Sequence, residues 1–211
     1  MSTMSLDSDD AVRLQACVKG GGVAVFPTDT VYGLCCDPES ETAAHKLYAL
    51  KGRPAARPAA IMFFALAPAL EMLDELHESE RAAVRALLPG PLTLLLANRS
   101  RRFAAACRTD LDTIGLRVPR LPAPLAALAE VSVAVMQSSA NLSGEPDARS
   151  LAEVAPSLRD GAELVIDGGE LPGTPSTVLD LRDWEEHRRW FVLREGALAT
   201  SAVEEALEAA L

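Results

Sequence analysis

Residues 23–54 read VAVFPTDTVYGLCCDPESETAAHKLYALKGRP, and this stretch sets the pattern for the whole chain. Two short apolar runs, Val23 to Phe26 and Val31 to Cys36, are separated by a polar turn, which is typical of two consecutive strands. Apolar side chains at helical spacing over residues 40–51 then predict a helix. A strand, a turn, a second strand and a helix in succession indicate an α/β protein.

Two cations, Lys51 and Arg53, stand at the end of that predicted helix. Lysine is a compact point charge and arginine a planar fork, so the pair suits the oxygens of a phosphate group. Basic residues followed by Gly52 and Pro54 are also what ordinary helix termination requires, because cations complement the helix dipole. These four residues alone leave both interpretations open.

The same alternation of helices and strands continues along the rest of the chain. Further helices are expected at residues 7–19, 68–73, 79–88, 122–130, 150–159 and 202–211. Further strands are expected at residues 59–66, 92–97, 114–118, 131–136, 163–167, 177–181 and 190–193. Since no linker or repeat interrupts the pattern, we expect one domain over residues 1–211, with a core at about 10–197 and a C-terminal helix at about 200–211.

Composition limits the classes of function. The formal net charge of −10 repels nucleic acid and anionic membranes, so any anion site must be a local basic pocket. The four cysteines lack a C-x-x-C pair and the three histidines lack metal-site spacing, which predicts free thiols and no structural zinc. The N-terminus does not resemble a signal peptide, and no long apolar run is present. We therefore expect a cytoplasmic protein without a membrane segment.

Polar side chains lie at the ends of several predicted strands, where Ser176 precedes its strand and the others close or follow theirs. They are Thr28, Asp29, Thr30, Arg117, Arg120, Ser138, Ser139, Asn141, Ser176 and Arg194. Ligands of open α/β sheets bind outside the carboxyl ends of strands, so this set predicts a small-molecule pocket, although each residue alone could form a turn or a cap. The set contains cations and neutral donors but no nucleophile-elbow serine, no activated Cys or His and no Walker A loop. Such a site can bind and orient anions without a covalent intermediate.

Seven short motifs occur in a fixed order along nearly the whole chain. They are PTDTVYGL at 27–34, KGRP at 51–54, PGPLTLLL at 89–96, IGLRVP at 114–119, SSANLSG at 138–144, STVLDL at 176–181 and LREGA at 193–197. In this order they make the chain similar to the YrdC-like family of threonylcarbamoyl-AMP synthases, whose K-x-R and S-x-N hallmarks are both intact. The resemblance implies an open, twisted mixed sheet flanked by helices, with a basic concave cleft.

The resemblance also implies an activity. This is the synthesis of threonylcarbamoyl-AMP from L-threonine, bicarbonate and ATP, with release of pyrophosphate. The product feeds N6-threonylcarbamoyladenosine formation in tRNA, so a tRNA threonylcarbamoyl transferase is the expected downstream partner. Mg²⁺ is expected with ATP, held mainly by phosphate oxygens and water, without a metal site in the protein.

The site residues follow from the same resemblance. Those implied to be catalytic are Lys51, Arg53, Ser139 and Asn141. Those implied to bind ATP are Lys51, Arg53, Arg57, Thr113, Asn141, Arg149 and Arg194. Those implied to bind threonine are Thr30, Arg117, Ser139 and Ser176, and the planar fork of Arg117 suits the carboxylate.

The chain departs from the family pattern at Arg57-Pro58, at Met62 and at residues 145–149. These departures leave open a paralogue that makes or transfers a carbamoyl-adenylate with another amine or carbamoyl donor. A third reading is a non-catalytic module that binds double-stranded RNA or ribosomal precursors. Its basic cleft would be formed by Arg99, Arg101, Arg102 and Arg120, and the net charge weakens this reading.

Overall fold

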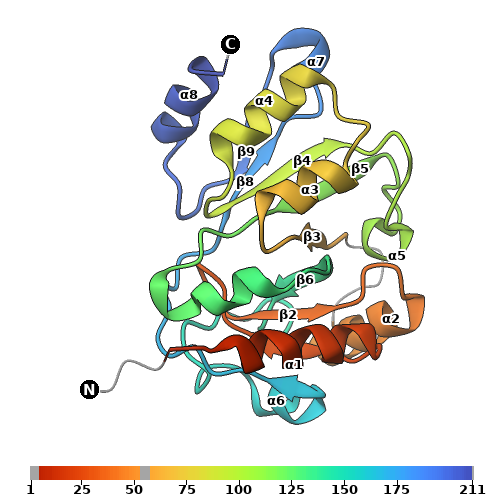
Figure 1. Cartoon of the computed structure of the whole chain (residues 1–211), viewed down its shortest axis with the longest axis vertical. Coiled ribbons are helices and arrows are strands. Elements are labelled where there is room, and N and C mark those ends of the chain that lie inside the picture. Colours follow the sequence, from red (N-terminus) through yellow and green to blue (C-terminus); the bar gives the residue numbers. More distant parts are fainter. Residues whose placement is uncertain (1–4, 53–57, 211) are drawn as a thin grey trace.

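One mixed sheet runs through the molecule. The structure is a computed structural model that describes residues 5–52 and 58–210. Within these residues the sheet has nine strands in the order β7-β1-β2-β6-β3-β5-β4-β8-β9 (Figure 1). Their bounds are β1 Ala24–Phe26, β2 Gly33–Cys36, β3 Ala60–Met62, β4 Leu92–Ala97, β5 Thr113–Arg117, β6 Val135–Ser139, β7 Leu164–Val165, β8 Thr177–Asp180 and β9 Phe191–Arg194. The predicted mixed α/β sheet flanked by helices is confirmed.

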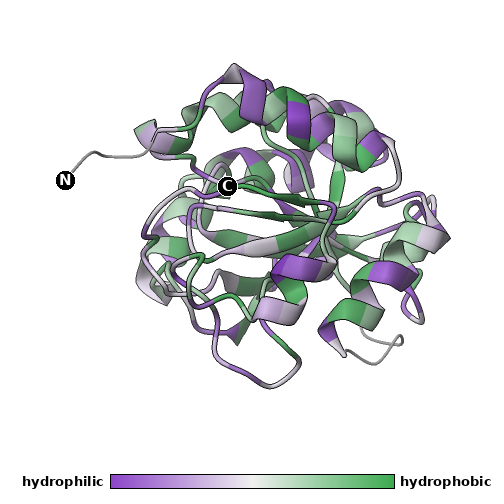
Figure 2. Ribbon diagram, turned by 90° about the horizontal axis from the view of Figure 1, so that it is seen from below, coloured by the Kyte–Doolittle hydropathy of each residue, from purple (hydrophilic) through white to green (hydrophobic). Residues whose placement is uncertain are grey.

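Helices lie above and below the strands in Figure 2, where the strands through the middle are strongly apolar. The helices are α1 Ser8–Lys19, α2 Glu41–Lys51, α3 Leu66–Met72, α4 Glu78–Leu87, α5 Ala104–Cys107, α6 Pro156–Gly161, α7 Trp184–His187 and α8 Thr200–Glu208, with a 3₁₀ helix η1 at Ala123–Glu130. Asp7 and Ser40 cap the N-termini of α1 and α2 through their side-chain oxygens. No helix in the described part of the chain is long and apolar enough to cross a membrane.

Several expected elements are shorter than the sequence pattern indicates. The strand expected at 59–66 ends at Met62, and α3 begins at Leu66, because Pro68 is tolerated in the first helical turn, where the N–H groups have no intrahelical partner. The strand expected at 131–136 begins only at Val135, since Ser132 is instead hydrogen-bonded to Gln15 of α1. The helix expected at 150–159 begins at Pro156. The short helices α5 and α7 were not expected.

The two faces of β4 differ, and this difference positions the site. Leu92, Leu94 and Leu96 are buried, whereas the alternate residues are half-buried. The sequence pattern predicts a strand covered on both faces, but only one face of β4 packs fully into the core. The half-buried face of β4 contributes Thr93 to the lining of a cavity.

Candidate active site

A cavity of about 230 Å³ lies over the middle of the sheet. It is lined by Val31, Pro58, Ala59, Ala60, Thr93, Arg117, Gln137, Ser138, Ser139, Asp147, Pro175, Ser176, Val178 and Arg194. Its floor is open because Ala60 of β3 lies beside Gly115 of β5, where an added Cβ would be 3.4 Å from the Ala60 Cα atom. Small residues on the central strands therefore make room for a ligand.

The register of the central strands gives this floor two ends. Ala60 is level with Gln137 of β6 on one side and with Gly115 of β5 on the other. β3 is parallel to β5 and antiparallel to β6, so β5 and β6 run in opposite directions. Arg117 lies two residues after Gly115 on β5, and Ser139 lies two residues after Gln137 on β6. The two side chains therefore lie on the same face of the sheet but toward opposite ends of the floor. We call these the Ser139 end and the Arg117 end.

Lys51 lies behind the Ser139 end and is not among the residues that line the cavity. Its side chain is buried, and Nζ donates hydrogen bonds to the Ser139 carbonyl oxygen and to Asn141 Oδ1, the latter at 3.0 Å. Ser139 Oγ donates to the same Asn141 oxygen at 2.6 Å. Gly52, with φ of 58°, adopts the left-handed conformation that ends α2 directly after Lys51. The structure thus joins Lys51 of the K-x-R motif to the S-x-N motif, which lies far from it in the sequence.

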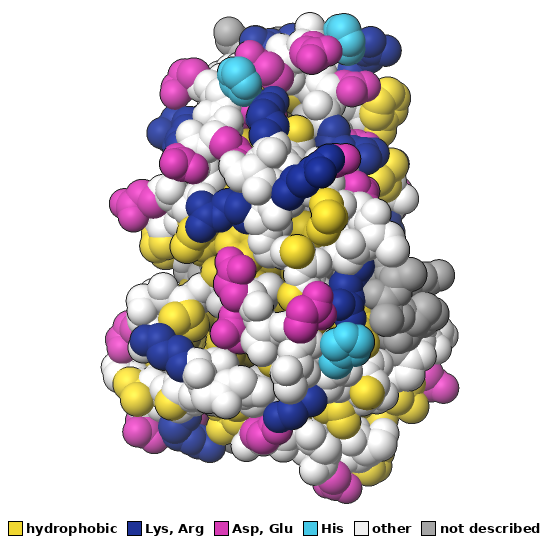
Figure 3. All heavy atoms as spheres, turned by 90° about the vertical axis from the view of Figure 1, so that its right-hand side faces the viewer, with side chains coloured by type: hydrophobic (Ala, Val, Ile, Leu, Met, Phe, Trp, Pro, Cys, Tyr) yellow, Lys and Arg dark blue, Asp and Glu magenta, His cyan; other side chains and the backbone are white. Residues whose placement is uncertain are grey.

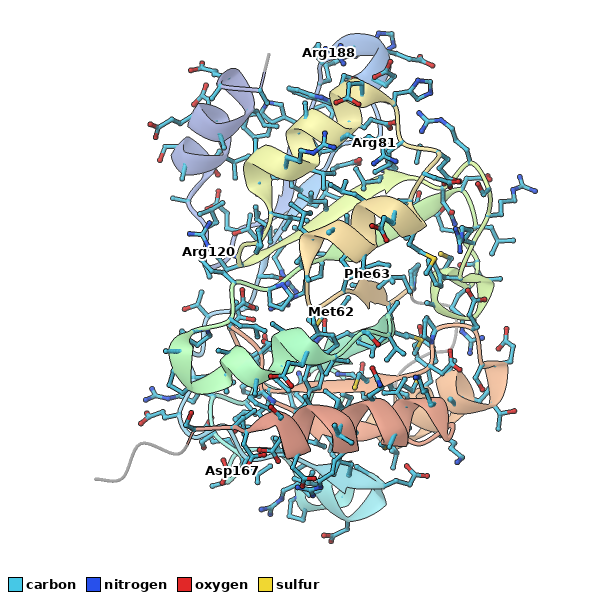
Figure 4. The ribbon with its side chains drawn as sticks, viewed as in Figure 1. Met62, Phe63, Arg81, Arg120, Asp167 and Arg188 are labelled. Carbon is cyan, nitrogen blue, oxygen red and sulfur yellow. The ribbon has the colours of Figure 1, made fainter. Side chains whose placement is uncertain are left out.

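Arg117 forms the other end and is buried in an ion pair. Its Nη2 donates to Asp29 Oδ1 at 2.7 Å and to Thr30 Oγ1 at 2.5 Å, and it lies 3.3 Å from Thr28 Oγ1. Asp29 Oδ2 also accepts the backbone N–H of Arg120 at 2.9 Å, in the loop after β5 (Figure 4). Arg117 Nε is buried without a partner among the described residues. One edge of the guanidinium is therefore fixed while the residue lines the cavity.

Ser176 and Arg194 meet at the Arg117 end. Arg194 donates through Nε and Nη2 to the Ser176 carbonyl oxygen, at 3.2 and 2.7 Å, and through Nη2 to Ser176 Oγ at 3.2 Å. Ser176 Oγ also lies 2.9 Å from Thr93 Oγ1. Gly196 permits this approach, because a Cβ there would lie 2.4 Å from the Pro175 carbonyl oxygen. The segments that contain the motifs STVLDL and LREGA are thus in direct contact.

The remaining predicted ATP residues are dispersed. Thr113 lies on the cavity face of β5 at the end opposite Arg117, and its hydroxyl accepts a hydrogen bond from Arg182. Arg194, also expected to bind ATP, lines the cavity and is hydrogen-bonded to Ser176. Arg149 pairs with Glu170 and lines a different cavity. Arg53 and Arg57 lie outside the described residues.

Some residues that line the cavity were not predicted from the sequence. Gln137 and Thr93 project from strands rather than following them, so the search at strand ends did not find them. Asp147 lies within the stretch that departs from the family pattern and lines two neighbouring cavities. The alternation of β6 could have indicated Gln137, since it lies two residues before Ser139.

Tyr32, inside the PTDTVYGL motif, is structural. Its hydroxyl donates toward Asp167 Oδ1 and the Gly169 carbonyl oxygen, at 3.0 and 2.9 Å, and accepts the N–H of Gly168 at 2.9 Å. Burial raises the pKa of this phenol above its usual value. Tyr32 therefore holds the loop that contains Asp167, at the lower edge of Figure 4, rather than moving protons.

The thiols do not supply a nucleophile. The four cysteines are free, as the sequence predicts. Burial raises the pKa of Cys36 to about 12 and that of Cys107 to about 11, so both remain protonated at neutral pH. Neither lines the cavity.

The expected basic cleft does not gather the arginines of residues 99–102. Arg99 is bound to both oxygens of buried Glu80, at 3.0 and 3.2 Å. Arg101 pairs with Asp112, and Arg102 donates to the Met72 carbonyl oxygen. Figure 3 shows cations and carboxylates interspersed over that side of the molecule. These arginines follow the end of β4 that lies away from Thr93, so the prediction that they form a cleft is wrong.

The buried Arg117–Asp29 pair predicts a large stability effect. Asp29→Ala should lower the free energy of unfolding by about 3 kcal/mol or more, because it leaves a buried guanidinium without its counter-ion. Asp112→Ala, which removes an exposed pair with Arg101, is the control and should cost about 1 kcal/mol or less. Urea denaturation of both variants measures the difference. Equal, small losses would contradict a structural role for the pair.

The fold and this site define a class of protein. It is an α/β protein whose pocket is lined by Arg117 and Arg194 at one end and backed by buried Lys51 at the other, with hydroxyl and amide groups between them. Such a pocket suits small anionic substrates, which it can hold side by side.

The family model Sua5/YciO/YrdC, described as "Telomere recombination", matches residues 16–196. The chain belongs to this family. It is 35% identical over 194 residues to a threonylcarbamoyl-AMP synthase of Pyrococcus abyssi, covering 90% of this chain and 55% of the relative. It is 34% identical over 190 residues to a threonylcarbamoyl-AMP synthase of Xanthomonas euvesicatoria, covering 85% and 96%.

A solved structure shows the same fold. P. abyssi Sua5 complexed with L-threonine matches with a TM-score of 0.81 and 31% identity, covering 95% of this chain and 58% of that one. The chain therefore spans little more than half the length of the Pyrococcus relatives, and about all of the Xanthomonas one.

Proposed function

We propose that this chain makes threonylcarbamoyl-AMP and pyrophosphate from L-threonine, bicarbonate and ATP. The observation that carries the proposal is the placement of two fixed cations at opposite ends of one cavity floor: Arg117 lines the cavity, and buried Lys51 lies behind the other end, bonded to the lining residue Ser139. A nucleotide at the Ser139 end and an amino-acid carboxylate at the Arg117 end would bring the amino group of threonine toward the α-phosphate. The names of the relatives, and the threonine complex of P. abyssi Sua5, support this assignment.

The chemistry needs little from the protein beyond position and charge. The amine of threonine adds to bicarbonate with loss of water and gives a carbamate. One carbamate oxygen then forms a bond to the α-phosphorus, and the bond to pyrophosphate breaks. Lys51 would stabilise charge on the phosphate oxygens, and Arg117 would hold the carboxylate. This fits a site without an activated nucleophile.

Magnesium belongs to the same proposal, as a companion of ATP. Among residues 5–52 and 58–210, no group of three or more His, Cys, Asp or Glu side chains could hold a metal ion. Asp147 is the acidic residue that lines the cavity. The ion would therefore be held by phosphate oxygens and water, with Asp147 contacting it through water.

The product would be passed on to tRNA. A threonylcarbamoyl-adenylate is an activated acyl donor, so a tRNA threonylcarbamoyl transferase would consume it to form N6-threonylcarbamoyladenosine. Direct RNA binding is disfavoured because Arg99, Arg101 and Arg102 are engaged with neighbouring groups. Arg57 and Met62 depart from the family pattern and left open a paralogue with another amine or carbamoyl donor. The next experiment tests this alternative.

The test is pyrophosphate release from ATP. We expect release only when threonine and bicarbonate are both present, and ¹⁴C-bicarbonate should appear in the adenylate. Carbamoyl phosphate or another amine in place of these substrates should give at most a few per cent of the rate. Equal release without threonine would sink the assignment and favour the paralogue.

A further inference from the structure

Gln137 occupies the middle of the cavity floor with an unsatisfied amide. The residue is 5% exposed and lines the cavity. No residue in the described part of the chain forms a hydrogen bond with its side chain, whereas Ser139, Ser176 and Arg117 all have partners. Neither amide atom is among the fully buried side-chain atoms without a partner, so the amide opens into the cavity, where a ligand or water can satisfy it. The amide is therefore placed for a ligand.

The neighbouring strand leaves space for this side chain. Gly33 of β2 lies next to Gln137, and a Cβ on Gly33 would come within 2.9 Å of the Gln137 amide nitrogen and 3.1 Å of the Phe26 ring. Ala60, level with Gln137 on the other side, is also small. The amide thus lies in a recess that any side chain at residue 33 would narrow.

The position of Gln137 relates it to both substrates. Ser139 lies two residues beyond it toward Lys51, and Arg117 lies toward the other end of the same face. If the proposed function holds, the nucleotide and the threonine carboxylate occupy these ends. The group that joins them, the carbamate formed from the amine and bicarbonate, must then lie over the middle of the floor.

We propose that the Gln137 carboxamide binds this carbamate and orients it for attack. A carbamate is planar, and its N–H lies on the same side as one of its oxygens. A primary amide offers a carbonyl oxygen and an N–H in the matching arrangement, so the two planes can form a pair of hydrogen bonds. The second carbamate oxygen remains free to bond to the α-phosphorus as pyrophosphate leaves, and Gln137 is unchanged.

Two substitutions test the proposal, which rests on the proposed function. Gln137→Leu removes both hydrogen bonds, and Gln137→Glu keeps the shape but repels an anion. Each should lower kcat/KM for bicarbonate about tenfold or more, since a decade corresponds to the loss of about one good hydrogen bond. Gln15→Leu, at a glutamine bound to Ser132 away from the cavity, should leave it unchanged.

The readouts separate the possible outcomes. Thermal shift with L-threonine and a non-hydrolysable ATP analogue, in bicarbonate-free buffer, should match wild type for both Gln137 variants. Loss of that thermal shift would mean that Gln137 contacts threonine or ATP itself. An unchanged kcat/KM for bicarbonate would mean that Gln137 does not contact the carbamate. Either result overturns the proposal. If Gln137→Leu does not fold, Gln137→Glu decides. A wild type without bicarbonate dependence would instead refute the proposed function, and this inference with it.

Discussion

Lys51→Met is expected to lower kcat for pyrophosphate release by about 10²–10³-fold, the usual cost of removing one charge-stabilising donor from a catalytic site. Lys51 Nζ is held between the Ser139 carbonyl oxygen and Asn141 Oδ1, so its charge is fixed in place before a nucleotide binds. Methionine keeps the unbranched stem and removes only the charge and the donors. The loss should therefore appear in kcat more than in the threonine KM.

Lys46→Met is the matched control for this prediction. Lys46 lies on the same helix α2 but is exposed, and its Nζ pairs with Glu163 at 3.2 Å on the surface. This substitution should change the rate less than about twofold and the stability by about 0.5 kcal/mol or less. If both lysine variants retain activity, Lys51 is a structural residue that ties α2 to β6. Melting temperatures of the two variants show whether a loss of rate is a loss of fold.

The sequence predicts the arrangement of elements better than their exact ends. Apolar periodicity and caps such as Asp7 and Ser40 act locally, so α1, α2, β4 and β8 were predicted to within a few residues. The segment before Val135 was predicted as strand but bonds to Gln15, because a tertiary contact replaced sheet pairing. Strand order and register depend on such long-range contacts and cannot be read from local patterns.

Only some residues of the candidate site could be predicted from the sequence. Lys51, Ser139 and Asn141 could be named from the family motifs, and the structure places them in contact. The ion pair that fixes Arg117 was not predicted, although Asp29 lies in a quoted motif, because a motif does not state which of its residues face each other. Gln137 was missed because its role depends on the absence of a side chain at Gly33, on a different strand.

Arg117→Lys is expected to raise the threonine KM about tenfold or more while the ATP KM changes little. The guanidinium uses Nη2 for Asp29, Thr28 and Thr30 and its Nε is fully buried, which leaves Nη1 for a substrate carboxylate. Hydrogen bonds to charged groups contribute roughly 1.5–3 kcal/mol each, and about 1.4 kcal/mol corresponds to one decade. Lysine has a single nitrogen, so it cannot bind Asp29 and the substrate with separate groups.

The choice of lysine keeps the test specific to substrate binding. A lysine at residue 117 retains a positive charge beside Asp29, so the buried carboxylate keeps its counter-ion and the fold should survive, unlike in Asp29→Ala. Arg120→Lys is the control and should leave the threonine KM unchanged, because the Arg120 side chain donates to the Pro89 carbonyl oxygen and to no other residue in the described part of the chain.

Thermal shift extends this prediction to the identity of the substrate. With a non-hydrolysable ATP analogue present, L-threonine should raise the melting temperature of wild type, and Arg117→Lys should need about tenfold more threonine for the same rise, because ligand stabilisation follows RT ln(1 + [L]/Kd). A paralogue that uses another amine, or a module that only binds RNA, would show no threonine shift in either protein. Absence of the shift in wild type would therefore exclude threonine as the amine, whatever the effect of the substitution on rate.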